Sequence, residues 1–263
     1  MRCLCAGSKF NPMKIVTWNC NGALRNKTQE IDRLGADILI IQECENPDES
    51  TEKFKNWAGS NYLWVGESKH KGLGIFPKNG NTVAKLNWNG HFKISGVASD
   101  SIALSWTTKA LKLFIPFVVN DELTILGVWT KADKSNKVFR YIGQFWKYLQ
   151  IHRSELSKAR TLVLGDFNSN AIWDKPDRWW NHSDVIKELK DINLESVYHL
   201  QFKEIQGQET RHTFFQHRHK EKPYHIDYAF ASSDLLNSCE LEVGSYDEWI
   251  SFSDHMPLCV SIT

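Results

Sequence analysis

Short apolar runs dominate the chain and recur along its whole length. β-Branched and aromatic residues fill these runs, and Asn, Asp and Gly separate many of them, which is typical of β-strands. The dipeptide Asn120-Asp121 lies between two runs and predicts a hairpin, so at least part of the sheet is antiparallel. The expected strands cover residues 13–19, 36–42, 61–65, 73–76, 82–86, 102–106, 111–119, 123–130, 161–164, 211–215, 225–231, 241–246 and 258–262.

Three segments place their apolar residues at helical spacing instead. They are residues 27–34, with Asn26 as the expected N-cap, residues 137–156, and residues 183–191, with Ser183 as the expected cap. Many strands with a few helices and hairpins predict a mixed α/β domain built on two sheets. Since no repeat or low-complexity linker divides residues 13–263, we expect one domain there, whereas residues 1–12 fit no amphipathic period and are expected to form a disordered extension.

Composition narrows the class of protein. With 263 residues, 41% hydrophobic and 24% charged, the chain has the make-up of a soluble globular domain. A formal charge of only +1 argues against a global grip on duplex DNA, so any nucleic-acid contact must be local. The sequence has neither an apolar window as long as a membrane span nor the apolar core of a signal peptide, so we expect a cytoplasmic protein that uses no membrane. Nothing in it implies a protein partner.

The cysteines point to reduced thiols. All six are scattered, without the paired spacing of a zinc site or of a small disulfide scaffold. They are Cys3, Cys5, Cys20, Cys44, Cys239 and Cys259.

Candidate chemistry begins where the apolar run 161–164 ends in Gly165, Asp166, Phe167 and Asn168. Gly165 gives the backbone freedom to leave the strand sharply. The two-residue spacing of Asp166 and Asn168 points both polar side chains to the same side if the chain stays extended. On its own, such a turn is more often an ordinary loop than a site.

Four other strand-like runs also end in polar groups. The ends are Asn19 to Gly22, Glu43, Asp227, and Asp254-His255. Each has an ordinary explanation by itself: a turn dipeptide, a helix cap, a satisfied backbone or a strand start. Together they indicate a single functional site, because Asn19 and Glu43 offer the oxygen donors that Mg²⁺ prefers. Asp166 could then take a proton from water, and His255, oriented by Asp227, could donate to a phosphate oxygen, so the set predicts a phosphoester hydrolase.

The order and the residues of these five motifs resemble those of the endonuclease/exonuclease/phosphatase superfamily. This superfamily includes pancreatic-type DNases, exonuclease III-like abasic-site endonucleases and sphingomyelinase or inositol-phosphatase relatives. The resemblance covers essentially residues 13–263. It implies a four-layer α/β sandwich of two packed mixed sheets flanked by helices, with the site at one edge. It also implies Mg²⁺ or Mn²⁺ as the cofactor, with Asn168 positioning the water or the phosphate. By the same resemblance, the metal ligands are Asn19, Glu43 and Asp254, and the catalytic residues are Asp166, Asn168, Asp227 and His255.

Two positions depart from the family pattern. Asn21 stands where abasic-site enzymes often have an aspartate, so one ligand charge is missing. The Gly-Val-Trp-Thr segment that contains Trp129 lies where relatives usually place a Tyr or His in contact with phosphate. Both departures leave generic hydrolysis intact, but they weaken an abasic-site assignment.

The expected substrate is DNA or RNA, single-stranded or locally opened. An aromatic loop with an arginine follows the Asp166 motif and could stack bases, although core packing is the simpler explanation for Trp146. The loop contains Trp173, Asp174, Arg178, Trp179 and Trp180, and the residues expected to bind substrate are Asn21, Trp129, Arg178, Trp179 and Trp180. Lys69, His70, Lys71 and the charged run 217–222 could contact a backbone, although a solvated loop explains that run most simply. A small-molecule or lipid phosphatase or phosphodiesterase of the same fold, favoured by the neutral charge, and a non-catalytic binding scaffold are the alternatives.

Overall fold

Two six-stranded sheets form the centre of the molecule. The computed structural model describes residues 12–98, 104–132 and 138–263. The first sheet contains β1 (Met13–Asn19), β2 (Ile38–Cys44), β3 (Leu63–Ser68), β4 (Lys71–Pro77), β15 (Cys239–Val243) and β16 (Leu258–Ile262). The second contains β5 (Val83–Lys85), β8 (Phe114–Val119), β9 (Leu123–Trp129), β10 (Thr161–Asp166), β11 (Leu194–Ser196) and β14 (Asp227–Ser232).

Short hairpins and helices complete the described parts of the chain. The hairpins pair β6 (His91–Lys93) with β7 (Ser105–Thr107), and β12 (Phe214–Phe215) with β13 (Pro223–Tyr224). The α-helices are α1 (Thr28–Asp32), α2 (Glu52–Ala58), α3 (Ile142–Leu156), α4 (His182–Lys190), α5 (Val197–Phe202), α6 (Ser233–Leu236) and α7 (Tyr246–Trp249). The 3₁₀ helices are η1 (Leu24–Asn26), η2 (Pro47–Glu49), η4 (Thr108–Ala110), η5 (Ala171–Trp173) and η6 (Gln216–Arg218).

Both sheets are mixed. Their strand orders are β15-β16-β1-β2-β4-β3 and β11-β14-β10-β9-β8-β5. β1 pairs with β2 in parallel, and β9 pairs with β10 in parallel, whereas the other neighbours in these sheets are antiparallel. The hairpin predicted at Asn120-Asp121 is confirmed, since β8 and β9 flank it as antiparallel neighbours.

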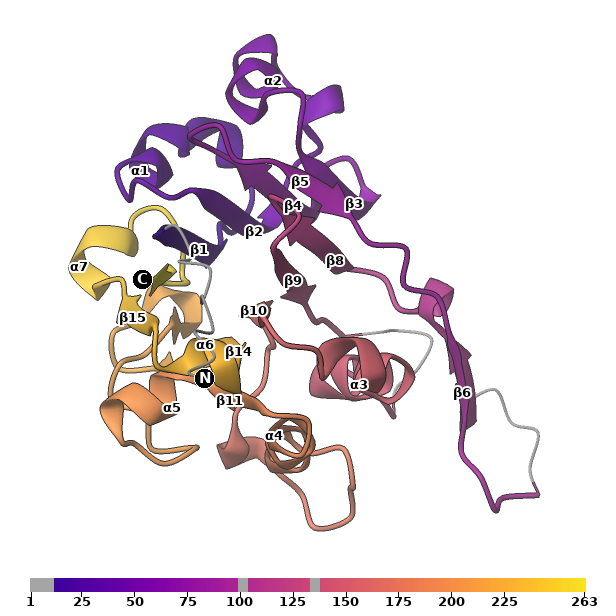
Figure 1. Cartoon of the computed structure of the whole chain (residues 1–263). Helices are drawn as coiled ribbons and strands as arrows, with labels where there is room; N and C mark the ends of the chain where they lie inside the picture. The colour runs from indigo at the N-terminus through magenta and orange to yellow at the C-terminus, as the bar shows by residue number, and fades with distance from the viewer. Residues whose placement is uncertain (1–11, 99–103, 133–137) are drawn as a thin grey trace, which may run out of the picture.

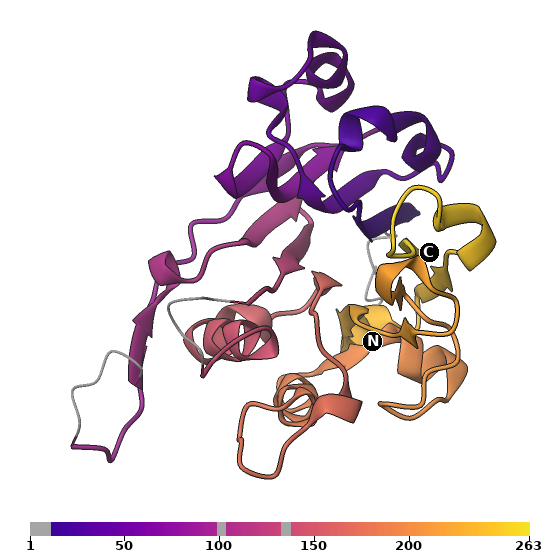
Figure 2. The same ribbon diagram turned by 180° about the vertical axis from the view of Figure 1, so that it is seen from behind.

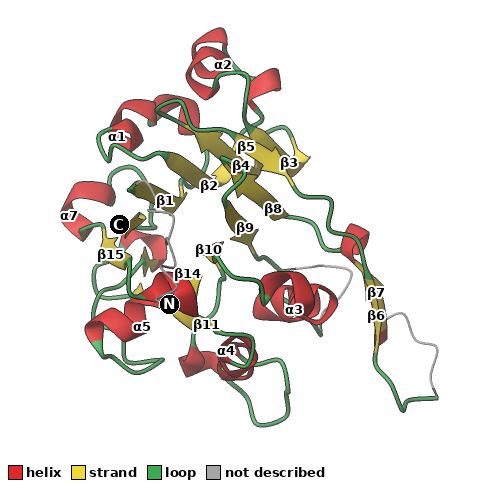
Figure 3. Cartoon of the chain, in the orientation of Figure 1, coloured by secondary structure: helices red, strands yellow, loops and turns green. Residues whose placement is uncertain are grey.

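Side chains of the central strands alternate between two cores, because successive residues of a strand point to opposite faces. In β2, Ile38 and Ile40 pack in the core between the sheets, while Leu39 and Ile41 pack in a second core with residues of α1, α2 and α7. β10 alternates in the same way against a third core that includes α3 and α4. The result is the expected four-layer α/β sandwich, with α1, α2 and α7 on one outer face and α3 and α4 on the other (Figures 1 and 3).

Helix starts differ from the sequence prediction. The prediction of Asn26 as an N-cap is wrong, because Asn26 ends η1 and Lys27 precedes α1. Ser183 is also not a cap. α4 begins one residue earlier, where Asn181 forms a capping box with Asp184, so Ser183 lies inside the first turn. The helix expected over 137–156 is observed from residue 142, and residue 137 lies outside the described residues.

A hairpin arm extends from the body of the molecule. Strands β6 and β7 form it, and it projects past α3 in both ribbon views (Figures 1 and 2). Phe92 stacks near Trp106, with 5.1 Å between ring centroids, and Trp106 packs 5.7 Å from Trp146 of α3. The base of the arm is therefore part of the aromatic core, and Trp146 packs in the interior as expected.

The remaining sequence expectations concern the N-terminus, the thiols and membranes. The extension expected for residues 1–12 falls outside the described residues except for Pro12, as do Cys3 and Cys5. The four described cysteines, at positions 20, 44, 239 and 259, are free thiols. Among the described residues, every helix is too short or too polar to cross a membrane.

Candidate active site

The strand ends singled out in the sequence meet at one edge of the sandwich. Parallel pairing places Asn19 beside Gln42 at the ends of β1 and β2, and Asp166 beside Trp129 at the ends of β10 and β9. The antiparallel partner of Asp166 is Asp227, the first residue of β14. Polar side chains from both sheets are therefore held side by side.

Asp166 lies at the centre of this group and is fully buried. Its Oδ2 accepts hydrogen bonds from Nδ2 of Asn19 and Nδ2 of Asn168, both at 2.9 Å, and its Oδ1 accepts from the Asn168 backbone N–H at 2.8 Å. Three donors hold the carboxylate in one orientation. Gly165 is required just before it, since a Cβ there would lie 1.9 Å from the Val128 carbonyl oxygen.

His255 forms a buried pair with Asp227. Its Nδ1 lies 2.9 Å from Oδ2 of Asp227, which leaves Nε2 as the ring nitrogen that can donate to a substrate. Burial disfavours the charged ring, but the negative charges of Asp227 and Asp166 outweigh it and raise the pKa of His255 to about 9. Burial also raises the pKa of Asp166 to about 7, against the opposing charge of His255. The environments thus provide a weakly acidic carboxyl group next to an imidazole that stays protonated at neutral pH.

Glu43 reaches the same edge through a β-bulge. The register of β2 against β4 shifts between Gln42 and Cys44, and Glu43 itself has a left-handed φ of 61°. Asn21 and Asn168 are left-handed too, with φ of 52° and 45°. Such conformations cost about 1–3 kcal/mol each in bulky residues, and less in Asn. Three of them at neighbouring strand ends indicate a site whose geometry the fold imposes.

The C-terminal Ser-Asp-His motif is fastened to β1. Ser253 Oγ donates to the Asn19 carbonyl oxygen at 2.7 Å and accepts from the His255 backbone N–H at 3.0 Å. The indole N–H of Trp18 donates to the His255 carbonyl oxygen at 2.9 Å. These bonds hold the backbone on both sides of Asp254, and the charge of Asp254 contributes to the raised pKa of His255.

The donor set at this edge fits a hard divalent cation. Asn19 and Glu43 project from the ends of neighbouring strands, and the half-buried carboxylate of Glu43 is paired with the ammonium group of Lys71. A positive charge therefore already lies where a cation would bind, and oxygen donors are those that Mg²⁺ and Mn²⁺ prefer. Ligand atoms of Asp166, Asp227 and His255 also lie within 4.8 Å of one another. Hydrogen bonds use atoms of this group, as they use Oδ1 of Asn19, which accepts from the Asn21 backbone N–H at 3.0 Å.

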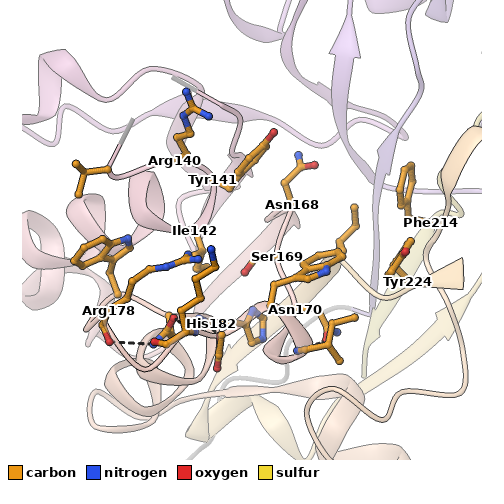
Figure 4. Close-up of a pocket in the computed structure, with 18 of the residues that line it drawn as sticks. Arg140, Tyr141, Ile142, Asn168, Ser169, Asn170, Arg178, His182, Phe214 and Tyr224 are labelled. Atoms are coloured by element: carbon orange, nitrogen blue, oxygen red, sulfur yellow. Dashed lines mark hydrogen bonds between the residues drawn. The ribbon is translucent and has the colours of Figure 1, made fainter. Parts of the chain in front are cut away.

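A cleft of about 1100 Å³ opens beside Asn168. Figure 4 shows Phe214 and Tyr224 on one side of it and Arg140 and Arg178 on the other. Trp173 also lines the cleft, 44% exposed, with its ring 5.1 Å from that of Tyr224. Aromatic faces and guanidinium groups thus surround a space next to Asn168.

The tryptophans of the loop after β10 differ in exposure. Trp179 is 55% exposed, as a base-stacking residue requires, and Arg178 lines the cleft. Trp180, expected in a polar loop, is only 6% exposed, because its ring packs 4.6 Å from Phe139 in the core. Trp180 also lines the cleft, so its role in stacking stays a prediction. Trp129 is buried as well, which leaves little of its ring for substrate.

Basic residues in loops near the site are partly held by hydrogen bonds and ion pairs. Lys69 and His70 are exposed at the β3–β4 turn, next to the Lys71 that pairs with Glu43. The run 217–222, expected to be a solvated loop, is anchored on the α7 region. There Arg218 donates to the Ser251 carbonyl oxygen at 3.0 Å, and Lys220 lies 3.7 Å from Asp247.

Two residues that support the site were not predicted from the sequence. Thr213 is fully buried, and its hydroxyl oxygen accepts from the backbone N–H groups of Ile226 and Asp227 at 2.9 and 3.0 Å. Asn170 anchors the cleft wall by donating to Glu209 at 3.0 Å and to the His225 carbonyl oxygen at 2.9 Å. The position of Asn170, two residues after Asn168, was the available signal; Thr213 gave none.

Comparisons with known proteins give a family match and similar solved structures. The sequence profile of the Endonuclease/Exonuclease/phosphatase family matches residues 16–255. The fold is similar to a 3′ phosphatase, NExo, from Neisseria bound to product DNA hairpin (TM-score 0.65, 19% identity, 95% of this chain and 99% of that chain). It is also similar to the catalytic domain of APE2 from Xenopus laevis (0.64, 18%, 94% and 91%) and to an AP endonuclease from Archaeoglobus fulgidus (0.61, 17%, 95% and 99%). A comparison with curated protein sequences gives no match.

Proposed function

Because the chain belongs to the Endonuclease/Exonuclease/phosphatase family, we propose that it is a divalent-metal-dependent nuclease that hydrolyses phosphodiester bonds in DNA or RNA. The observation that carries the proposal is the buried Asp166, fixed by Asn19 and Asn168 next to the Asp227–His255 pair. This arrangement supplies a general base and a hydrogen-bond donor to the phosphate within one rigid group.

Each side chain has a role that its environment supports. Mg²⁺ or Mn²⁺ held by Asn19, Glu43 and Asp254 would polarise a phosphate oxygen and neutralise the charge that develops on it. Asp166, with a pKa of about 7, takes a proton from the attacking water as the water oxygen bonds to phosphorus. The ester bond breaks with its electron pair on the leaving oxygen, and this alkoxide takes a proton from solvent. His255, protonated at neutral pH, donates from Nε2 to a non-bridging oxygen.

The cleft favours nucleic acid over a small phosphoester. Its volume of about 1100 Å³ exceeds what a phosphate group alone occupies. The exposed ring of Trp173 and the guanidinium of Arg178 offer stacking surfaces, and bases bind such surfaces regardless of sequence. NExo, a 3′ phosphatase, is bound to a product DNA hairpin in its structure, so a phosphate at the end of a nucleic acid is the second candidate substrate.

A substrate panel tests the proposal. Purified protein with Mg²⁺, Mn²⁺ or EDTA is incubated with single-stranded DNA, duplex DNA, abasic DNA, RNA, DNA ending in a 3′ phosphate, and bis-p-nitrophenyl phosphate. We expect metal-dependent hydrolysis of at least one nucleic acid, much faster than that of the chromogenic diester. Undiminished turnover after exhaustive EDTA treatment would refute the metal requirement, and activity on the small diester alone would refute the substrate class.

A further inference from the structure

Positive charge is concentrated in one segment of a nearly neutral chain. Residues 68–120 contain seven lysines, no arginine and one acidic residue, Asp100, for a formal charge of +6, whereas the whole chain carries +1. The rest of the chain is therefore net negative. A segment with this asymmetry can attract an anionic polymer although the protein as a whole does not.

The fold collects three of these lysines around a second cleft, which we name the lysine cleft. It has a volume of about 340 Å³ and lies between the end of β5, η4 and the start of β8. Lys85, Lys109 and Lys112 line it, together with Trp88. Lys112 Nζ is 4.0 Å from Glu67 Oε1, but Lys85 and Lys109 form no ion pair with any described residue. Two ammonium groups at the cleft thus lack a carboxylate partner in the part of the chain that the structure describes.

A polar group in the lining of the lysine cleft also lacks a partner. Tyr148 contributes to this lining, and its buried hydroxyl has no hydrogen-bond partner within the described ranges. Its ring is fixed between Phe114, at 4.6 Å, and His152, at 4.5 Å, so the hydroxyl cannot readily turn away. Leaving such a group unsatisfied costs free energy, which a bound ligand would recover.

The lysine cleft lies at the same edge of the sandwich as the catalytic side chains. Phe114, the first residue of β8, pairs with Val128, one residue before the end of β9. Glu67 connects the lysine cleft with the residues after β9, because its carboxylate forms ion pairs with both Lys112 and Lys131. The cleft of about 1100 Å³ beside Asn168 borders the residues that follow β10, whereas the lysine cleft lies beyond β9, on the β8–β5 side. A strand that ran from the active site toward β8 and β5 would pass Lys131 and Lys112.

We propose that the lysine cleft binds the sugar–phosphate backbone of a nucleic-acid strand that continues past the active site. The inference rests on the proposed function in taking nucleic acid as the substrate. Lys85 and Lys109 pair with phosphates, the ring of Trp88 is available to a base or sugar, and the Tyr148 hydroxyl donates to a backbone oxygen. Binding here adds affinity for long strands without taking part in hydrolysis.

The test compares two pairs of charge reversals with the same change in net charge. K85E/K109E alters the lysine cleft. K53E/K158E is the matched control, because Lys53 on α2 and Lys158 after α3 are exposed and lie outside both clefts. Affinity of the full chain for labelled single-stranded DNA and RNA is measured by fluorescence anisotropy in EDTA over a series of salt concentrations, with melting temperatures recorded to verify folding.

We expect K85E/K109E to bind a strand of about 30 nucleotides roughly tenfold or more weakly, and to lower the salt slope by about 1.4, which is two single-strand phosphate contacts. A strand of about five nucleotides, too short to span both clefts, keeps its affinity. The control pair changes neither quantity beyond a general effect of net charge. Equal losses in the two pairs, or no loss in either, would overturn the proposal. Absence of hydrolysis by the wild type would instead refute the proposed function, and the comparison of affinities would still test the binding proposal.

Discussion

Replacing Asp166 by Asn separates the catalytic from the structural role of this residue most sharply. Asn has nearly the same size and keeps one acceptor oxygen, but an amide cannot take a proton from water. If Asp166 is the general base, the rate of the chemical step falls by about 10²- to 10⁴-fold, equivalent to roughly 3–5 kcal/mol of activation free energy.

The cost in stability is much smaller and can be worked out from the hydrogen bonds. Oδ2 of Asp166 accepts two amide donors and Oδ1 accepts the backbone N–H of Asn168, so an Asn oxygen at the Oδ2 position keeps two of three bonds. One lost charge-assisted bond costs about 1.5–3 kcal/mol. Burial opposes the charged carboxylate, as its raised pKa shows, and the neutral amide escapes part of that penalty. We expect a net loss of about 1–2 kcal/mol, which lowers the melting temperature by only a few degrees.

Single-turnover cleavage at saturating Mg²⁺, measured alongside the melting temperature, distinguishes the two roles. Asp37→Asn is the control, since Asp37 accepts a backbone N–H from Lys14 at 2.8 Å just before β2, at the opposite end from Glu43. The control should lose comparable stability and keep its cleavage rate within a few-fold. Near-normal cleavage by folded Asp166→Asn protein would refute the base assignment and, with it, the centre of the proposed mechanism.

Three further changes probe the rest of the site. Glu43→Gln keeps the side-chain shape but removes a ligand charge, so the Mn²⁺ dissociation constant measured by calorimetry should rise at least tenfold; an unchanged constant would make Glu43 structural. In the wild type, activity should fall below about pH 7, where Asp166 protonates, and above about pH 9, where His255 loses its proton. Asp227→Asn should lower the pKa of His255, visible by NMR, and move the alkaline limit to lower pH; an unmoved limit contradicts the pairing. Trp173→Ala with Trp179→Ala should weaken nucleic-acid turnover about 5- to 150-fold while sparing a small diester, because base stacking contributes about 1–3 kcal/mol per base, and equal losses on both substrates would indicate packing instead.

The central strands could be predicted because their sequence signal is local. β1 occupies residues 13–19, as its apolar run indicates, and β16 occupies 258–262. The predicted ends of elements were less accurate where several side chains compete to cap them. Asn181 rather than Ser183 caps α4 because its side chain also bonds to the backbone N–H of Lys175 at 2.9 Å, a contact six residues away that no local pattern reveals.

The candidate site was predictable in its members but not in its geometry. Polar groups at the ends of buried strands identified Asp166, Asp227 and His255, and the structure joins them by register and hydrogen bonds. The bulge that carries Glu43 to the edge has no signature in the sequence Gln-Glu-Cys, because it arises from pairing with β4. The burial of Trp180 likewise depends on Phe139, 41 residues earlier in the numbering of the chain, and not on the polar residues that flank it.

The site gathers at one edge the unfavourable features that the rest of the fold avoids. Asp166 is a buried carboxylate, Glu43 has a left-handed backbone, and Asp227 and His255 are charged groups removed from water. Each of these costs free energy, and each persists because the surrounding structure fixes it. The strands that end here continue into cores packed on both faces of their sheets, so a local loss of a few kcal/mol does not unfold them. The same strands set the spacing between the general base, the hydrogen-bond donor to phosphate and the proposed metal ligands. The rigid packing of these strands therefore compensates for the unfavourable features and also preorganises the groups for hydrolysis.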